Sequence, residues 1–392
     1  MNQTHGRSLL LVNDQTSLTL FEDDFLPQLD GQVIGLDIEE DREYGYLPVV
    51  ALIQITLGTM DVVLDPVALG HAKLSAVVES LCLTPELIVM HGCNNDVTGL
   101  KRDWGVGPQR LYDTQVAARF AGCERFGLSA LLQEKFGVEL NKSVRRSNWR
   151  ERPLTDELLQ YAREDTVWLI ALRDQLHERA VAAGWEDAIH EENEVLSSLR
   201  AESVDFEPWG WRRMKGIGSL SPQGSGRMHQ LWAWRDDLGH RTDRHPQRVI
   251  PNWMLVELAE RGSSALDSML RNGPSSLGRH RGALQALLDA APALAGDERN
   301  GGDGLNRRGR RSPTYLSAAM QQRLDALTAW RDRTAQQTGL EASWLASRGL
   351  LEGLARLTEP SPRAIRATEG VREWRVRRYL DDWLPILERY PV

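Results

Sequence analysis

The chain has 392 residues, of which 41% are hydrophobic, so it is long enough for two or three domains with apolar cores. Its formal net charge of -8 argues against a protein that attracts nucleic acid or membranes through overall positive charge, although a local basic patch remains compatible. Three cysteines without metal-ligand spacing or a disulfide framework favour a reducing, cytoplasmic compartment. The apolar run at residues 9–12 is too short for a secretory leader, and no membrane span is expected.

The first 200 residues alternate strand-like and helix-like segments. Apolar or β-branched runs predict strands at 33–38, 50–57, 59–65 and 87–91. Helical patterns follow at 70–82, 95–103, 113–121, 127–136 and 155–183. This alternation predicts a mixed α/β sheet flanked by helices, and the close succession of the first three strands predicts an antiparallel part.

The β signals disappear after residue 200, and two helical stretches resemble each other. Residues 231–236 (LWAWRD) match residues 327–332 (LTAWRD), and each is followed by a Trp-centred helix, a Pro-Ser element and a final helix. The internal repeat predicts two small helical bundles, joined by a Gly- and Arg-rich flexible linker at 293–313. Tryptophans at helical spacing are expected in the cores of these bundles rather than as base-stacking platforms: Trp232, Trp234, Trp253, Trp330, Trp344 and Trp383.

Two carboxylates stand at the end of the first apolar strand. Asp37 and Glu39 lie two residues apart, so their side chains project from the same face of the strand. Like charges at this distance repel each other and raise a pKa, whereas a divalent cation between them makes the pair favourable. Hard oxygen ligands suit Mg²⁺ or Mn²⁺. A solvated strand end is the alternative for this motif alone.

Two further acidic positions complete a set of four. Asp96 follows the strand at 87–91, near the start of the next helix, where it is either a functional side chain or an ordinary helix N-cap. Tyr161 and Asp165 are separated by four residues, so they share one helix face. A surface Tyr–Asp pair is the alternative interpretation of that spacing.

The order D-x-E, Asp and Y-x-x-x-D resembles the DEDD superfamily of 3′→5′ exonucleases, in the subclass with Tyr in its last motif. Segments at 52–54, 112–115, 127–131 and 147–155 are similar to ribonuclease D, and the helical repeats are similar to HRDC domains. The resemblance implies a ribonuclease H-like mixed sheet flanked by helices, with an exonuclease domain at 1–205. It implies two all-α HRDC bundles at 220–292 and 314–392.

The same resemblance implies an activity. The expected enzyme removes nucleoside 5′-monophosphates from the 3′ ends of structured RNA by two-metal-ion hydrolysis, and the expected substrates are tRNA precursors. Asp37, Glu39, Asp96 and Asp165 are the expected ligands of two Mg²⁺ or Mn²⁺ ions. Tyr161 is the expected residue that orients the attacking water, because its ordinary pKa near 10 makes it a poor general base.

Cations concentrate just before the Tyr–Asp helix. The residues expected to neutralise RNA phosphates there are Lys142, Arg145, Arg146, Arg150 and Arg152, with a solvated loop as the alternative. We expect a monomer without an obligate protein partner. Two other functions stay open at this point: a DNA exonuclease of the Werner or proofreading type, which has the same acids, and a binding scaffold that has lost catalysis.

Overall fold

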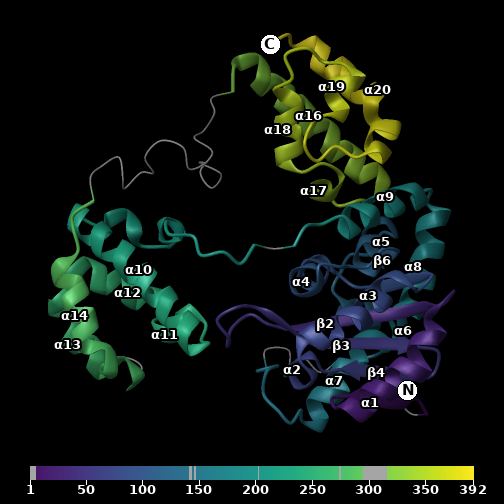
Figure 1. Ribbon diagram of the computed structural model, residues 1–392. Coiled ribbons are helices and arrows are strands. Elements are labelled where there is room, and N and C mark those ends of the chain that lie inside the picture. Colours follow the sequence, from purple (N-terminus) through teal and green to yellow (C-terminus); the bar gives the residue numbers. More distant parts are fainter. Residues whose placement is uncertain (1–5, 141–143, 145–146, 202, 273–274, 295–315) are drawn as a thin grey trace. The chain divides into compact units, whose positions relative to one another are not determined.

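The computed structural model describes residues 6–140, 144, 147–201, 203–272, 275–294 and 316–392 (Figure 1). The chain divides into two compact units. The first comprises residues 1–39, 50–202 and 315–392, and the second comprises residues 40–49 and 203–314. Among the described residues, no helix is both long and apolar enough to cross a membrane.

The first unit is built on a mixed sheet, as the sequence predicts. Its strands follow the order β1-β4-β3-β2-β5-β6. The pairs β1–β4, β2–β5 and β5–β6 are parallel, and β3 runs antiparallel to β4, which confirms the predicted antiparallel part. The strand bounds are β1 Ser8–Val12, β2 Val33–Asp41, β3 Val49–Leu57, β4 Met60–Leu64, β5 Leu87–Met90 and β6 Leu111–Asp113.

Helices flank this sheet. They are α1 Gln15–Leu20, α2 Pro66–Leu69, α3 Ser75–Leu83, α4 Asn94–Trp104, α5 Thr114–Phe120, α6 Leu128–Phe136, α7 Asp156–Val167, α8 Leu169–Ala182 and α9 Glu186–Ser197. The helical pattern predicted at 155–183 forms two helices, because the helix is interrupted at Trp168 between α7 and α8. That indole is buried against Phe136, with ring centroids 4.9 Å apart.

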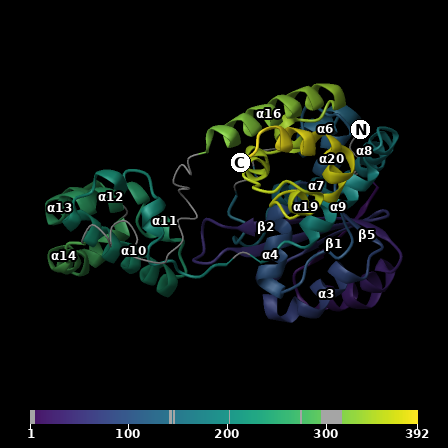
Figure 2. The ribbon, with the colours of Figure 1, turned by 90° about the horizontal axis from the view of Figure 1, so that it is seen from above.

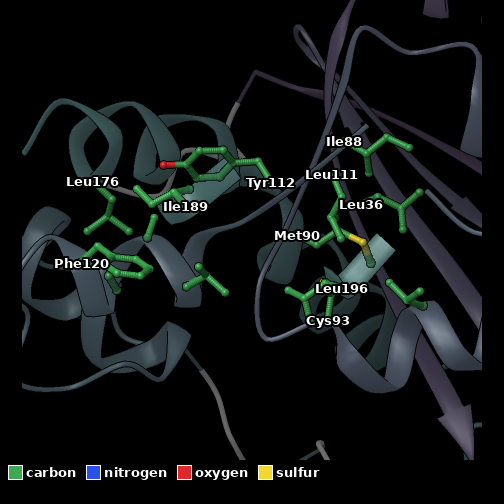
Figure 3. Packing of buried hydrophobic residues seen from close by; sticks show 14 of the residues in the cluster. Leu36, Ile88, Met90, Cys93, Leu111, Tyr112, Phe120, Leu176, Ile189 and Leu196 are labelled. Carbon is green, nitrogen blue, oxygen red and sulfur yellow. The ribbon is translucent and has the colours of Figure 1, made fainter. Parts of the chain in front are cut away.

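The alternation of β2 explains how the sheet positions its acids. Ile34, Leu36 and Ile38 are buried in the main apolar core, which also contains Ile88 and Met90 of β5. Figure 3 shows Leu36 together with these two residues and with Leu111 of β6. Since side chains alternate along a strand, Gly35, Asp37 and Glu39 occupy the opposite face of β2.

The second helical repeat belongs to the first unit. It contains α16 Ala318–Thr338, α17 Ala342–Leu345, α18 Arg348–Ala355, α19 Pro362–Arg366 and α20 Glu373–Arg389. Helix α20 packs against α9 (Figure 1 and Figure 2). Trp330 and Trp383 are buried and Trp344 is partly buried against the same core, as predicted for all three.

The first helical repeat forms a separate core in the second unit. Its helices are α10 Pro222–Thr242, α11 Pro246–Val249, α12 Asn252–Arg261, α13 Ser263–Asn272 and α14 Arg281–Ala290. Trp232 and Trp234 pack against this core. Trp253 does not, and its prediction as a core residue is wrong: it is 60% exposed, because α12 turns Met254 and Leu255 inward and leaves Trp253 on the outside.

The second unit also contains the connection between β2 and β3. The Tyr46 hydroxyl donates to Asp236 at 2.8 Å, and the Arg248 guanidinium lies 3.8 Å from the centre of the Tyr44 ring. Most of the predicted linker at 293–313 lies outside the described residues. Leu294 at its start is buried, and its amide donates to the Pro222 carbonyl.

Candidate active site

The site begins in the second half of β2, on the face turned away from the main core, and the predicted end of this strand at residue 38 is wrong. Asp37 and Glu39 occupy this face, and the strand continues to Asp41. Oxygens of Asp37, Glu39 and Asp165 all lie within 4.8 Å of one another. Three of the four predicted acids therefore converge from two elements that are distant in sequence.

Helix α7 brings Tyr161 and Asp165 to these carboxylates. Thr155 caps the helix by accepting a hydrogen bond from the Leu158 amide. Tyr161 and Asp165 are both buried and are hydrogen-bonded to each other, so the alternative of an exposed surface pair is wrong. The predicted sharing of one helix face is confirmed.

Gly35 allows α7 to approach the sheet. A Cβ atom at Gly35 would lie 2.9 Å from the Thr166 carbonyl oxygen, a distance that side chains do not tolerate against backbone. Thr166 directly follows Asp165 in the chain, and Gly35 lies on the same face of β2 as Asp37. Because glycine has no side chain, the strand and the helix that carry the acids can lie this close together.

Asp96 lies in the first turn of α4, directly after the turn that follows β5. Gly92 adopts φ +64°, a left-handed conformation that favours glycine. The buried Asp113 carboxylate accepts hydrogen bonds from the amides of Gly92 and Cys93, both at 2.9 Å, and thereby holds the turn. Cys93 is the N-cap of α4 and Asp96 lies within its first turn, so Asp96 is not the N-cap.

The electrostatics of the site show that the other three acids act on Asp37. The pKa of Asp37 is raised well above its usual value, first by burial and then by the charges of Asp96, Asp165 and Glu39. Asp96 is not one of the three acids whose oxygens lie within 4.8 Å of one another. Its charge nevertheless raises the pKa of Asp37 more than the charge of either other acid does. Burial, followed by the charges of Asp165 and Glu39, also raises the pKa of the Tyr161 hydroxyl.

The donor set fits divalent cations of the Mg²⁺ type. Carboxylate oxygens are the hard ligands that such ions prefer, and clustered acids that raise one another's pKa values are stabilised by a cation among them. Asp37, Glu39 and Asp165 are the residues that would hold it, with Asp96 near enough to act on the Asp37 carboxyl. No thiol or imidazole belongs to the cluster of described ligand residues.

Of the predicted basic contacts, Lys142, Arg145 and Arg146 lie outside the described residues. Arg150 is partly exposed. The Arg152 guanidinium donates to both oxygens of the buried Asp65, at 2.5 and 2.7 Å, and to the Trp149 carbonyl. Arg152 also donates to the Ala51 carbonyl of β3, so it anchors its segment to the sheet.

Two supporting features were missed by reasoning from the sequence. The buried Asp61 of β4 accepts hydrogen bonds from Arg7, from Arg163 of α7 and from the Thr56 hydroxyl. The buried Trp149 ring lies 6.0 Å from the Tyr161 ring. An acid near the start of an otherwise apolar strand was the available signal for Asp61.

The sheet, the convergent acids and the helical repeats define a class of nuclease. A family model described as 3′-5′ exonuclease matches residues 16–180, and one described as HRDC domain matches residues 225–279 and 320–387. The exact boundaries of the predicted domains stay a prediction.

Individual relatives agree with this class. Ribonuclease D of Xanthomonas oryzae is 32% identical over 82% of this chain and 85% of its own length. Exosome complex component 10 of Homo sapiens is 28% identical over 59% of this chain, which corresponds to 27% of that protein. The crystal structure of Escherichia coli RNase D covers 97% of this chain and 99% of its own, with a TM-score of 0.63 and 23% identity.

The chain belongs to the ribonuclease D family. It is accordingly a nuclease of the 3′-5′ exoribonuclease type, with an RNase D-like exonuclease fold and a helical HRDC region.

Proposed function

We propose that this protein trims the 3′ ends of structured RNA, with tRNA precursors as its substrates, by hydrolysis that requires two divalent metal ions. The observation that carries the proposal is the convergence of Asp37, Glu39 and Asp165, with Asp96 close enough to raise the pKa of Asp37. Family membership supports RNA as the substrate class. The Escherichia coli structure is described as that of an exoribonuclease involved in structured RNA processing.

The four acids would hold Mg²⁺ or Mn²⁺. When bound, the ions would supply an acidified water and neutralise the charge that develops on the phosphate and on the leaving 3′-oxygen. By holding the ions, the four acids would also position the terminal phosphodiester of the RNA. The products would be nucleoside 5′-monophosphates.

Tyr161 has a different role from the acids. Its raised pKa keeps the hydroxyl protonated at neutral pH, so it cannot serve as a general base there. The hydroxyl is held by Asp165, and the ring packs beside Trp149. We assign it to orienting the attacking water by hydrogen bonding.

The segment at 142–152 would place positive charge beside the site. Lys142, Arg145, Arg146 and Arg150 remain proposed phosphate contacts. Arg152 contributes by holding the segment on Asp65. The HRDC repeats would contact the body of the RNA. We also propose a cytoplasmic, monomeric protein, in line with three buried free cysteines.

A side-by-side digestion tests the function. A 5′-labelled stem-loop RNA with a single-stranded 3′ tail, and DNA of the same sequence, are incubated with the full chain in Mg²⁺ or in EDTA. We expect stepwise shortening of the RNA from its 3′ end, release of nucleoside 5′-monophosphates and no reaction in EDTA. Asp165→Ala should nearly abolish turnover even in saturating Mg²⁺.

The same experiment separates the competing functions. Faster shortening of DNA than of RNA would favour a DNA exonuclease. Binding of RNA without release of mononucleotides would favour a scaffold. Full activity of Asp165→Ala would contradict the assignment of the acids.

A further inference from the structure

Gln54 carries a buried amide that no described residue pairs by hydrogen bonding. It lies within β3 with a fully buried side chain, and neither its Oε1 nor its Nε2 has a hydrogen-bond partner among the described residues. A primary amide carries two N–H donors and an acceptor oxygen, and leaving them unpaired in the interior is costly. Such a group calls for an explanation beyond packing.

The side chain of Gln54 faces α7. Thr56 lies two residues further along β3, and its hydroxyl is 2.9 Å from that of Thr166, so this face of β3 is turned toward the helix. Gln54 shares the face because side chains alternate. Its partner in β4, Val63, belongs to the apolar cluster of Tyr161 and Ala162.

The register between β2 and β3 places Gln54 beside Asp37. The two strands are neighbours joined by residues 42–48, a connection too short for a parallel crossover, so they run antiparallel. A Cβ at Gly35 would lie 3.6 Å from the Thr56 Cβ, which makes these two residues opposite each other. Two steps forward along β2 and two back along β3 reach Asp37 and Gln54, whose Cβ atoms are then about 4.5–5.5 Å apart.

We propose that Gln54 is a positioning residue of the metal site, whose Nε2 group donates a hydrogen bond to the Asp37 carboxylate when divalent cations are bound. This inference rests on the proposed function. A carboxylate that gives one oxygen to a cation keeps further acceptor capacity, and an outer hydrogen bond fixes its orientation. A neutral amide provides that bond without adding a charge that would repel the cation or compete with it.

The test measures Mn²⁺ binding to the full chain without RNA. Free Mn²⁺ is followed by electron paramagnetic resonance for wild type, Gln54→Met and Thr334→Val. Methionine keeps the size of the side chain and removes its N–H donors. Thr334, a buried polar residue of α16 in the second repeat, serves as the control.

We expect Gln54→Met to raise the Mn²⁺ dissociation constant about tenfold, while the melting temperature without metal stays equal to that of wild type or rises. Thr334→Val should leave the dissociation constant within about twofold of wild type. Wild-type Mn²⁺ affinity in folded Gln54→Met would overturn the inference and leave the proposed nuclease function intact. If the wild-type protein does not bind Mn²⁺, the result would instead contradict the proposed metal site, and both proposals would fail.

A second measurement does not depend on the folding of a variant. A crystal structure of the wild-type protein with Mn²⁺ should show Gln54 Nε2 within about 3.2 Å of an Asp37 carboxylate oxygen. A Gln54 amide that remains unpaired, or that bonds to another group, would overturn the assignment.

Discussion

At the scale of single residues, the Asp37 carboxyl is harder to ionise than an ordinary aspartate. Its pKa is raised first by burial and then by three neighbouring carboxylates. A carboxyl group with a higher pKa in the folded than in the unfolded chain binds its proton more strongly when folded. The metal-free protein therefore loses stability as the pH rises above the unfolded value of about 4, until the folded pKa is passed.

Asp37→Asn should consequently stabilise the metal-free protein while it abolishes RNA digestion. The amide removes a partly buried charge that three neighbouring carboxylates repel, so we expect a gain on the order of 1–2 kcal/mol at pH 8 and a weaker fall of stability between pH 5 and pH 8. Thermal unfolding in EDTA across this pH range measures both effects. An Asn variant with the wild-type pH dependence would show that Asp37 does not carry the raised pKa.

Tyr161→Phe should separate catalysis from metal binding. The hydroxyl is held by Asp165 and stays protonated, so its loss removes one hydrogen bond near charged groups, worth about 1.5–3 kcal/mol. We expect kcat to fall about 10- to 100-fold, while Mn²⁺ affinity remains at the wild-type level. Asp165→Ala is the comparison, because it should lose both properties. A parallel loss of Mn²⁺ affinity in Tyr161→Phe would indicate that the hydroxyl supports the ligands instead.

At the scale of secondary-structure elements, the site depends on how closely α7 lies on the sheet. Arg163 of α7 donates to the buried Asp61 of β4 at 3.0 Å, and the Thr56 and Thr166 hydroxyls lie 2.9 Å apart. These contacts tie the helix to β3 and β4. Gly35 completes the arrangement by leaving room on β2.

Gly35→Ala should push α7 away from β2. The new methyl group would lie 2.9 Å from the Thr166 carbonyl oxygen, which belongs to the backbone and cannot rotate away. Since Asp165 is the preceding residue, we expect a lower melting temperature and a turnover reduced about 100-fold by the displaced ligand. Gly282→Ala is the control, because the space around Gly282 in α14 is open and activity should stay unchanged. Unchanged Mn²⁺ affinity and turnover in Gly35→Ala would show that the separation is not critical.

At the scale of the whole molecule, the second helical repeat is a fixed part of the unit that contains the exonuclease sheet. Glu192 of α9 is buried and accepts hydrogen bonds from the Trp374 indole at 2.9 Å and from Arg375 at 2.8 Å. Glu191 accepts from the amides of Glu373 and Trp374 at the start of α20. Phe120 adds ring contacts with Trp344 and Trp374.

Glu192→Ala should therefore destabilise the first unit by about 3 kcal/mol, because the buried Arg375 loses its carboxylate partner. Thermal unfolding of the full chain measures the loss. Glu194→Ala, which removes an exposed pair with His190, should change stability by less than about 0.5 kcal/mol. Equal effects of the two substitutions would contradict the structural role of Glu192.

The sequence by itself determined the features that depend on local spacing. Asp37 and Glu39 share a strand face because strands repeat every two residues, and Tyr161 and Asp165 share a helix face because helices repeat every 3.6. The matching segments at 231–236 and 327–332 likewise identified two helical repeats. These periodicities are properties of the backbone, so they hold before any tertiary contact forms.

Only the tertiary structure decided which separate elements meet. The short edge strands β1 and β6, the break at Trp168 and the exposure of Trp253 follow from packing that local patterns do not encode. The close contact at Gly35 and the unpaired amide of Gln54 become apparent only once α7 lies over the sheet. Contacts between residues far apart in sequence arise from the burial of the whole chain, and no local pattern specifies them.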